Sequence, residues 1–163
     1  MPVTQLTEDS VSRIQHWAQK VNDHPENLDI AARRTLSSVA ERLDPLDGFI
    51  DAVLAWENLF SGRPETNLRV CGAIAWFLEP QSYDRRVQLF DEIGKLYASR
   101  SSLVHGSTAT IDNAAAARDR AVQIAVECMR RLYANPELLH AKDSSARGRM
   151  LLMGCTAGRT ELA

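Results

Sequence analysis

Residues 83–106 read YDRRVQLFDEIGKLYASRSSLVHG, and this stretch predicts one long helix. Residues at steps of three or four share one face of a helix. The residues at those steps here are Val87, Phe90, Gly94, Tyr97, Ser101 and Val104. Ser82 is a suitable N-cap, and Gly106 is suited to the position just past the helix end. The resulting stripe is apolar where the helix begins and polar where it ends.

The polar end of this helix carries three residues with useful chemistry: Arg100, Ser101 and His105. Ser101 and His105 are four positions apart, so their side chains can touch. Arginine is always charged and can hold a phosphate, while histidine titrates near neutrality and can move a proton. A plainer interpretation is also open, in which Arg100 and His105 only stabilise the helix C-terminus, where a cation contributes about 0.3–1 kcal/mol.

The rest of the chain predicts further helices and no strand of useful length. Helical periodicity runs through 8–21 with Thr7 as N-cap, about 27–43, 45–60 with Asp44-Pro45 at its start, 65–79, 112–133 with Asp112 as N-cap, and a short turn at 137–140. Segment 65–79 is apolar on most faces and is expected to be the most buried helix. We therefore expect an all-α bundle of about five to six helices over residues 1–143, and a tail or docking segment over 144–163.

The composition is typical of one globular domain. The chain has 163 residues, of which 45% are hydrophobic and 25% charged. No apolar run approaches the ~20 residues of a membrane span, and the N-terminus lacks the features of a signal peptide, so we expect a cytoplasmic protein with no membrane partner. The cysteines at 71, 128 and 155 are widely spaced, as is typical of reduced thiols. The net charge of −2 gives no general attraction to nucleic acid, so any RNA contact must be local.

The sequence gives no reason to expect a metal or a cofactor. Histidines stand at 16, 24, 105 and 140, without His-x3-His spacing, and no Cys-x2-Cys pair occurs. Gly94-Lys95 lacks the other residues of a phosphate-binding P-loop. Chemistry at residues 100–105 would therefore have to proceed without a metal ion.

Four elements follow one another between residues 44 and 106. They are LDGFIDAVLAWENLF at 46–60, LRVCGAIAWFL at 68–78, Arg85-Arg86, and LYASRSSLVHG at 96–106. The first has an acidic start and an alanine-x-Glu-x-leucine finish around Glu57, and the last contains an Arg-x4-His element. Together they resemble the ApeA-like branch of the HEPN superfamily of all-helical domains, and the match covers about 40% of the chain.

The resemblance implies a bundle that pairs with a second copy and places two Arg-x4-His elements in one cleft. In catalytic members this cleft is a metal-independent endoribonuclease, and many members act in phage defence or in toxin–antitoxin pairs. The expected partners are single-stranded RNA, a second copy of the chain, and an antitoxin or defence-complex protein. Because other members have lost catalysis, the alternative is a non-catalytic module that dimerises and binds RNA, a nucleotide or a protein. Such a module can also be one domain of a larger defence protein.

Under this resemblance each site residue has an expected role. His105 is expected to be the general base and Arg100 to hold the phosphate, with Ser101 orienting one of them. Glu57 is expected to fix Arg100, because a buried arginine needs a partner. Tyr97 either stacks on a base or belongs to the core, and the core is the commoner place for a tyrosine on an apolar stripe. Three further arginines are expected to extend the RNA-binding surface: Arg69, Arg85 and Arg86.

Overall fold

Every regular element in residues 7–61, 66–104 and 113–154, the ranges that the computed structural model describes, is helical. The α-helices there are α1 (Glu8–Val21), α2 (Asp29–Leu36), α3 (Pro45–Phe60), α4 (Thr66–Leu78), α5 (Tyr83–Val104), α6 (Ala114–Tyr133), α7 (Pro136–Leu139) and α8 (Ser144–Leu152). A 3-10 turn, η1 (Glu26–Leu28), precedes α2, and a π-helical turn, η2 (Ser37–Glu41), follows it. The all-α prediction is confirmed, and the helix count exceeds five to six because two short helices, α7 and α8, follow α6. No helix in these ranges is both long and apolar enough to cross a membrane.

The helix starts follow from local capping. The Thr7 hydroxyl accepts from the Ser10 amide at 3.2 Å, and the Asp44 carboxylate accepts from the Leu46 amide at 2.7 Å, with Pro45 as the first residue of α3. At the start of α6 the cap is Asn113, which accepts from the Ala116 amide at 2.9 Å. The predicted cap of this helix, Asp112, lies outside the described residues.

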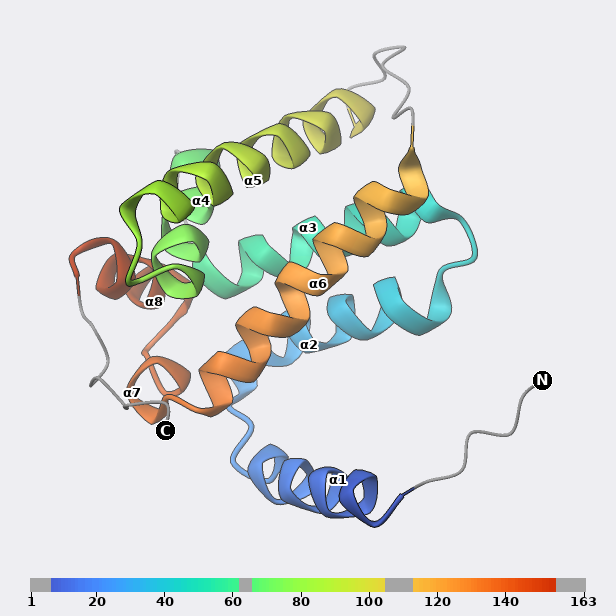
Figure 1. The fold of residues 1–163 in the computed structure, drawn as a ribbon, viewed down its shortest axis with the longest axis vertical. Coiled ribbons are helices and arrows are strands. Elements are labelled where there is room, and N and C mark those ends of the chain that lie inside the picture. The colour runs from blue at the N-terminus through green and yellow to red at the C-terminus, as the bar shows by residue number, and fades with distance from the viewer. Residues whose placement is uncertain (1–6, 62–65, 105–112, 155–163) are drawn as a thin grey trace.

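The core is built around α3, which packs against α2, α4, α6 and α8. In Figure 1, α6 crosses in front of α3, while α4 and α5 lie together on one side of it. Nine of the sixteen residues of α3 are buried, and the indole of Trp56 donates to the Ala121 carbonyl of α6 at 3.2 Å. The expectation that segment 65–79 is the most buried helix is wrong. Six of the thirteen residues of α4 are buried, and Leu68 is 62% exposed.

Helix α1 is set apart from the rest of the bundle (Figure 1). None of its residues is buried. It is attached by an edge-on contact of Trp17 with Tyr133, at 5.9 Å between ring centroids. His24, three positions after the last residue of α1, forms a hydrogen bond with the Tyr133 hydroxyl through Nδ1, and its Nε2 lies 3.0 Å from Asp29 Oδ1.

A buried carboxylate, Asp51, joins α3 to the preceding segment. Its side chain is 3% exposed, and it accepts from Arg34 Nη1 at 2.5 Å and from Arg42 Nε at 2.6 Å. Burial raises the pKa of Asp51, but the hydrogen bonds from the two guanidinium groups lower it by more, so the pKa of this carboxyl lies below its ordinary value. The carboxylate therefore stays charged at neutral pH.

Residues 144–152, expected to be part of a tail or docking segment, form α8, which packs on α3 and α4. Arg147 is fully buried and donates to four acceptors: the carbonyls of Leu138 at 2.8 Å, Leu59 at 2.9 Å and Leu139 at 3.3 Å, and the Asn27 amide oxygen at 3.0 Å. Burial lowers the pKa of Arg147 to about 10, so it is still charged at neutral pH. Residues 155–163 lie outside the described residues.

The residue after this arginine, Gly148, lets α8 approach the end of α3. A Cβ atom at Gly148 would lie 2.2 Å from the Phe60 carbonyl oxygen, far inside contact distance. Only glycine therefore fits where the two backbones meet. The polar-looking stretch after Lys142 is thus a helix held in place by the buried hydrogen bonds of Arg147 together with the apolar side chains at its end, of which Leu151 is part of the core.

Candidate functional site

Three of the residues singled out in the sequence meet between α3 and α5. The Tyr97 hydroxyl donates to Glu57 Oε1, and Arg100 Nη1 lies 3.9 Å from the same oxygen. Tyr97 and Arg100 are three positions apart on α5, so they share one face of that helix. The side chains of Glu57 and Arg100 are 22% and 21% exposed, so this ion pair is mostly withdrawn from water. We call these three residues the Glu57–Tyr97–Arg100 cluster.

The surroundings of Tyr97 and Arg100 define how these two members of the cluster are bonded. Burial, followed by the hydrogen bond to Glu57, raises the pKa of Tyr97, so the phenol stays protonated and acts as a donor. Arg100 Nε is buried and has no hydrogen-bond acceptor in the described part of the chain. A buried N–H group without an acceptor is costly, and an anionic oxygen is its best partner. The cluster therefore presents a cation that is held in place but not fully bonded.

Ser101 and His105 complete the predicted catalytic set. Ser101 follows Arg100 on α5 and is half-buried. His105 lies outside the described residues, one position after the last residue of α5, Val104. The expected contact between His105 and Ser101 is therefore still a prediction from their spacing.

Arg85 and Arg86 lie far from this cluster along α5, and Arg69 lines a cavity that contains none of the three cluster residues. Arg86 is fourteen residues before Arg100 on α5, which is about 21 Å along the axis at about 1.5 Å per residue. The Arg86 guanidinium lies over the Trp76 ring, 3.6 Å from its centroid, and Nη1 donates to two carbonyls at the end of α4, those of Glu79 and Pro80, both at 3.2 Å.

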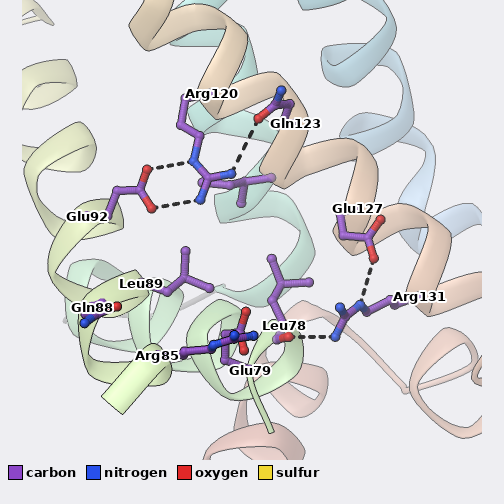
Figure 2. A pocket seen from close by; sticks show the side chains of 11 residues that line it. Leu78, Glu79, Arg85, Gln88, Leu89, Glu92, Arg120, Gln123, Glu127 and Arg131 are labelled. Carbon is purple, nitrogen blue, oxygen red and sulfur yellow. Dashed lines mark hydrogen bonds and ion pairs between the residues drawn. The ribbon is translucent and has the colours of Figure 1, made fainter. Parts of the chain in front are cut away.

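Arg85 lines a cavity of about 500 Å³ between α5 and α6, shown in Figure 2. Its walls carry three arginines and three glutamates. Arg120 donates to both carboxylate oxygens of Glu92, at 2.6 and 2.8 Å, and Arg131 donates to Glu127 at 2.9 Å. Because the charges on the walls balance, this cavity has little attraction for an anion. We call it the balanced cavity.

Sequence reasoning missed a second cavity, of about 620 Å³, which is lined by residues of α4, α5 and α8. Arg69 and Arg86 line it, together with Arg149 and the aromatic rings of Trp76 and Phe90. The sequence predicts a tail over residues 144–163 and therefore does not point to Arg149. The local signal for a helix there is the capping aspartate, Asp143, whose carboxylate accepts from the Ala146 amide at 2.7 Å. We call this second site the arginine cavity.

The described residues include no group of three His, Cys, Asp or Glu side chains that could hold a metal ion. Burial raises the pKa of the Cys71 thiol to about 11, so this residue is a neutral thiol at physiological pH. Comparisons with protein-family models, curated proteins and solved structures find no match to this chain. The features of this chain that bear on function are therefore the Glu57–Tyr97–Arg100 cluster and the sequence that follows it.

Proposed function

We propose that this chain is a metal-independent endoribonuclease of the HEPN type, which acts as a dimer in phage defence or in a toxin–antitoxin pair. The observation that carries the proposal is the Glu57–Tyr97–Arg100 cluster. It fixes an incompletely bonded guanidinium five positions before His105 in the sequence. These are the two groups that cleavage of RNA requires when no metal is used.

RNA supplies its own nucleophile, the 2′-hydroxyl group. In the proposed reaction His105 removes the 2′-hydroxyl proton, and the 2′-oxygen forms a bond to the phosphorus atom. Arg100 binds the non-bridging oxygens and stabilises the charge that they gain in the transition state. The bond to the 5′-oxygen then breaks, and this oxygen takes a proton from water or from a second His105. The products are a 2′,3′-cyclic phosphate and a 5′-hydroxyl group.

Glu57 and Tyr97 are positioning residues in this mechanism. At 3.9 Å, the contact from Arg100 Nη1 to Glu57 is too long for a hydrogen bond, so it attracts the guanidinium without using its donors. The Tyr97 hydroxyl in turn donates to the Glu57 oxygen that faces Arg100. This arrangement supports the proposal because the guanidinium is oriented while Nη1 and Nη2 form no hydrogen bond with the described residues. The part of Arg100 that remains exposed can therefore donate to a phosphate, whereas the buried Nε cannot reach one.

The mechanism needs a second copy of the chain if a second His105 is to act as the acid. Large hydrophobic side chains that remain exposed favour a partner. Among the described residues twelve such side chains are exposed, and seven of them lie between Val11 and Leu43. Light scattering coupled to size-exclusion chromatography tests this step, and the proposal predicts the mass of a dimer.

The decisive test is cleavage of labelled single-stranded RNA in the presence of EDTA. We expect the wild-type protein to cleave it, and Arg100→Ala and His105→Ala to reduce the rate by at least about 100-fold. Arg130→Ala is the control, because this exposed arginine of α6 lies outside both the cluster and the predicted RNA-binding residues, and it should keep full activity. Binding of RNA without cleavage by the wild-type protein would instead favour the non-catalytic module.

A further inference from the structure

We propose that the arginine cavity binds a small organic anion with an apolar body, such as a medium-chain carboxylate or alkyl phosphate. The cavity has a volume of about 620 Å³, which lies within the range of about 300–1,000 Å³ that is typical of small-molecule sites. It is distinct from the Glu57–Tyr97–Arg100 cluster, from which Arg86 is about 21 Å away along α5. The inference therefore does not depend on the proposed nuclease.

The charge of the cavity is uncompensated. Arg69 of α4, Arg86 of α5 and Arg149 of α8 line it, and none of the lining side chains is a carboxylate. Within the described ranges none of these three arginines forms an ion pair. The balanced cavity in Figure 2 is the contrast, since its three arginines face three glutamates. Three unpaired guanidinium groups around one cavity favour an anionic head group.

One of these guanidinium groups is already oriented. Arg86 lies flat over Trp76, and its Nη1 is fixed by the carbonyls at the end of α4. No hydrogen bond from Arg86 Nε or Nη2 is formed with the described residues. A carboxylate or phosphate can accept from these groups without a large loss of side-chain entropy, because the arginine is held before the ligand arrives.

The remaining walls are apolar and come from all three helices. Trp76 and Phe90 provide aromatic surface, and Leu152 of α8 closes against α4 at Gly72, where a Cβ atom would lie 2.7 Å from the leucine methyl. At the rim, Val87 and Met153 are 40% and 80% exposed. An apolar body of a ligand would bury these side chains. A polynucleotide would leave this surface uncovered, because its phosphates need cations along an open groove, and we therefore favour the small amphipathic anion.

Isothermal titration of the full chain with decanoate and with decyl phosphate tests the proposal. We expect saturable binding of one ligand per chain, at least tenfold tighter than that of acetate or inorganic phosphate, which have the head group alone. Decyltrimethylammonium, which has the same tail and the opposite charge, should not bind. The stronger of the two anions identifies the preferred head group. Trp76 should report the binding as a change in fluorescence that is lost in Trp76→Phe.

Variants separate the charged site from general hydrophobic binding. Arg149→Gln removes an exposed guanidinium that makes no hydrogen bond with the described residues, and it should weaken binding about tenfold without loss of folding. Arg86→Gln should weaken binding at least as much. Arg85→Gln, a neighbour that lines the balanced cavity, should bind normally. The proposal is overturned if decyltrimethylammonium binds as tightly as the anions, or if no anion binds saturably below its critical micelle concentration. It is also overturned if both Arg149→Gln and Arg86→Gln bind decanoate as the wild-type protein does, or if an RNA oligonucleotide displaces decanoate.

Discussion

Replacing Arg147 with alanine is expected to lower the free energy of unfolding by about 3 kcal/mol. The side chain is fully buried and no carboxylate is among its hydrogen-bond partners. Its guanidinium joins α8 to α3 through the Leu59 carbonyl, and to α7 through the carbonyls of Leu138 and Leu139. The substitution removes all of these links together.

The magnitude follows from the groups left behind. Loss of Arg147 leaves the carbonyls of Leu59 and Leu139 without this donor, whereas the Leu138 carbonyl still accepts from the Ala141 amide at 3.4 Å. An unpaired buried carbonyl costs about 1–3 kcal/mol, and a value in the lower part of this range applies because relaxation of a short helix lets water reach part of the site. Two such carbonyls at about 1.5 kcal/mol each give about 3 kcal/mol. Two smaller effects oppose each other: the cavity destabilises the variant, while loss of a desolvated charge stabilises it. The fourth acceptor belongs to Asn27, an exposed residue that can bond to water instead.

Urea denaturation followed by circular dichroism measures this loss. A domain stable by about 5–15 kcal/mol remains folded after it, so both proteins can be titrated. Arg147→Lys should also lose stability, because one ammonium group cannot reach acceptors on three sides. Arg149→Ala, two positions further along α8 and exposed, is the control and should change the free energy by less than about 0.5 kcal/mol. If Arg147→Ala were as mild as this control, α8 would be a loosely attached tail and the reasoning would be refuted.

The remaining predictions concern packing, pH and positioning. Gly148→Ala should lower the free energy of unfolding by about 1–3 kcal/mol, because the new methyl group meets the Phe60 carbonyl. Gly94→Ala, with open space around the new methyl group, should raise it by about 0.5–1 kcal/mol by stabilising α5. Thermal melts of the two variants measure both effects. Folding lowers the pKa of Asp51, so the contribution of this carboxylate to stability is present above about pH 4 and is lost as the pH falls through the folded-state pKa. Asp51→Asn should therefore be less stable than the wild-type protein at pH 7 and should lose less stability than the wild-type protein on acidification. Tyr97→Phe should reduce kcat by up to about tenfold with little change in KM, since it removes one hydrogen bond that orients Glu57.

Each of these predictions has a result that contradicts it. Equal melting temperatures for the alanine variants at Gly148 and Gly94 would show that α8 does not pack closely on α3. Parallel acid-unfolding curves for Asp51→Asn and the wild-type protein would show that the Asp51 carboxylate contributes no pH-dependent stability. A Tyr97→Phe enzyme with full kcat would place this tyrosine in the core alone.

Local signals in the sequence were sufficient for the helical class and for several helix starts. Asp44-Pro45 and Thr7 predict their helices because capping depends only on a side chain and the next few amides. Periodicity alone could not decide which helix is central. Segment 65–79 is apolar on most faces, but its Leu68 and Trp76 line the arginine cavity instead of the core. What covers an apolar face depends on tertiary packing, which a local pattern does not contain.

The role of Arg147 was beyond local reasoning for the same reason. Its acceptor on Leu59 is 88 positions away in the sequence, and an arginine in the polar stretch DSSARGR at 143–149 is typical of a solvated loop. The contact between Glu57 and Arg100 could be expected, because Glu57 is a carboxylate in an otherwise apolar helix and a buried arginine needs such a partner. The bond from Tyr97 to Glu57 was not expected, since an apolar stripe predicts only that the tyrosine ring packs against the core.

The central claim is that Arg100 and His105 cleave RNA without a metal, and the termini of the reaction products test it most directly. Purified wild-type protein and His105→Ala are incubated with a defined RNA in EDTA, and the fragments are analysed by mass spectrometry. We predict fragments with 2′,3′-cyclic phosphate and 5′-hydroxyl termini from the wild-type protein and intact RNA from the variant. Intact RNA in both samples, or the same fragments from both, would contradict the claim.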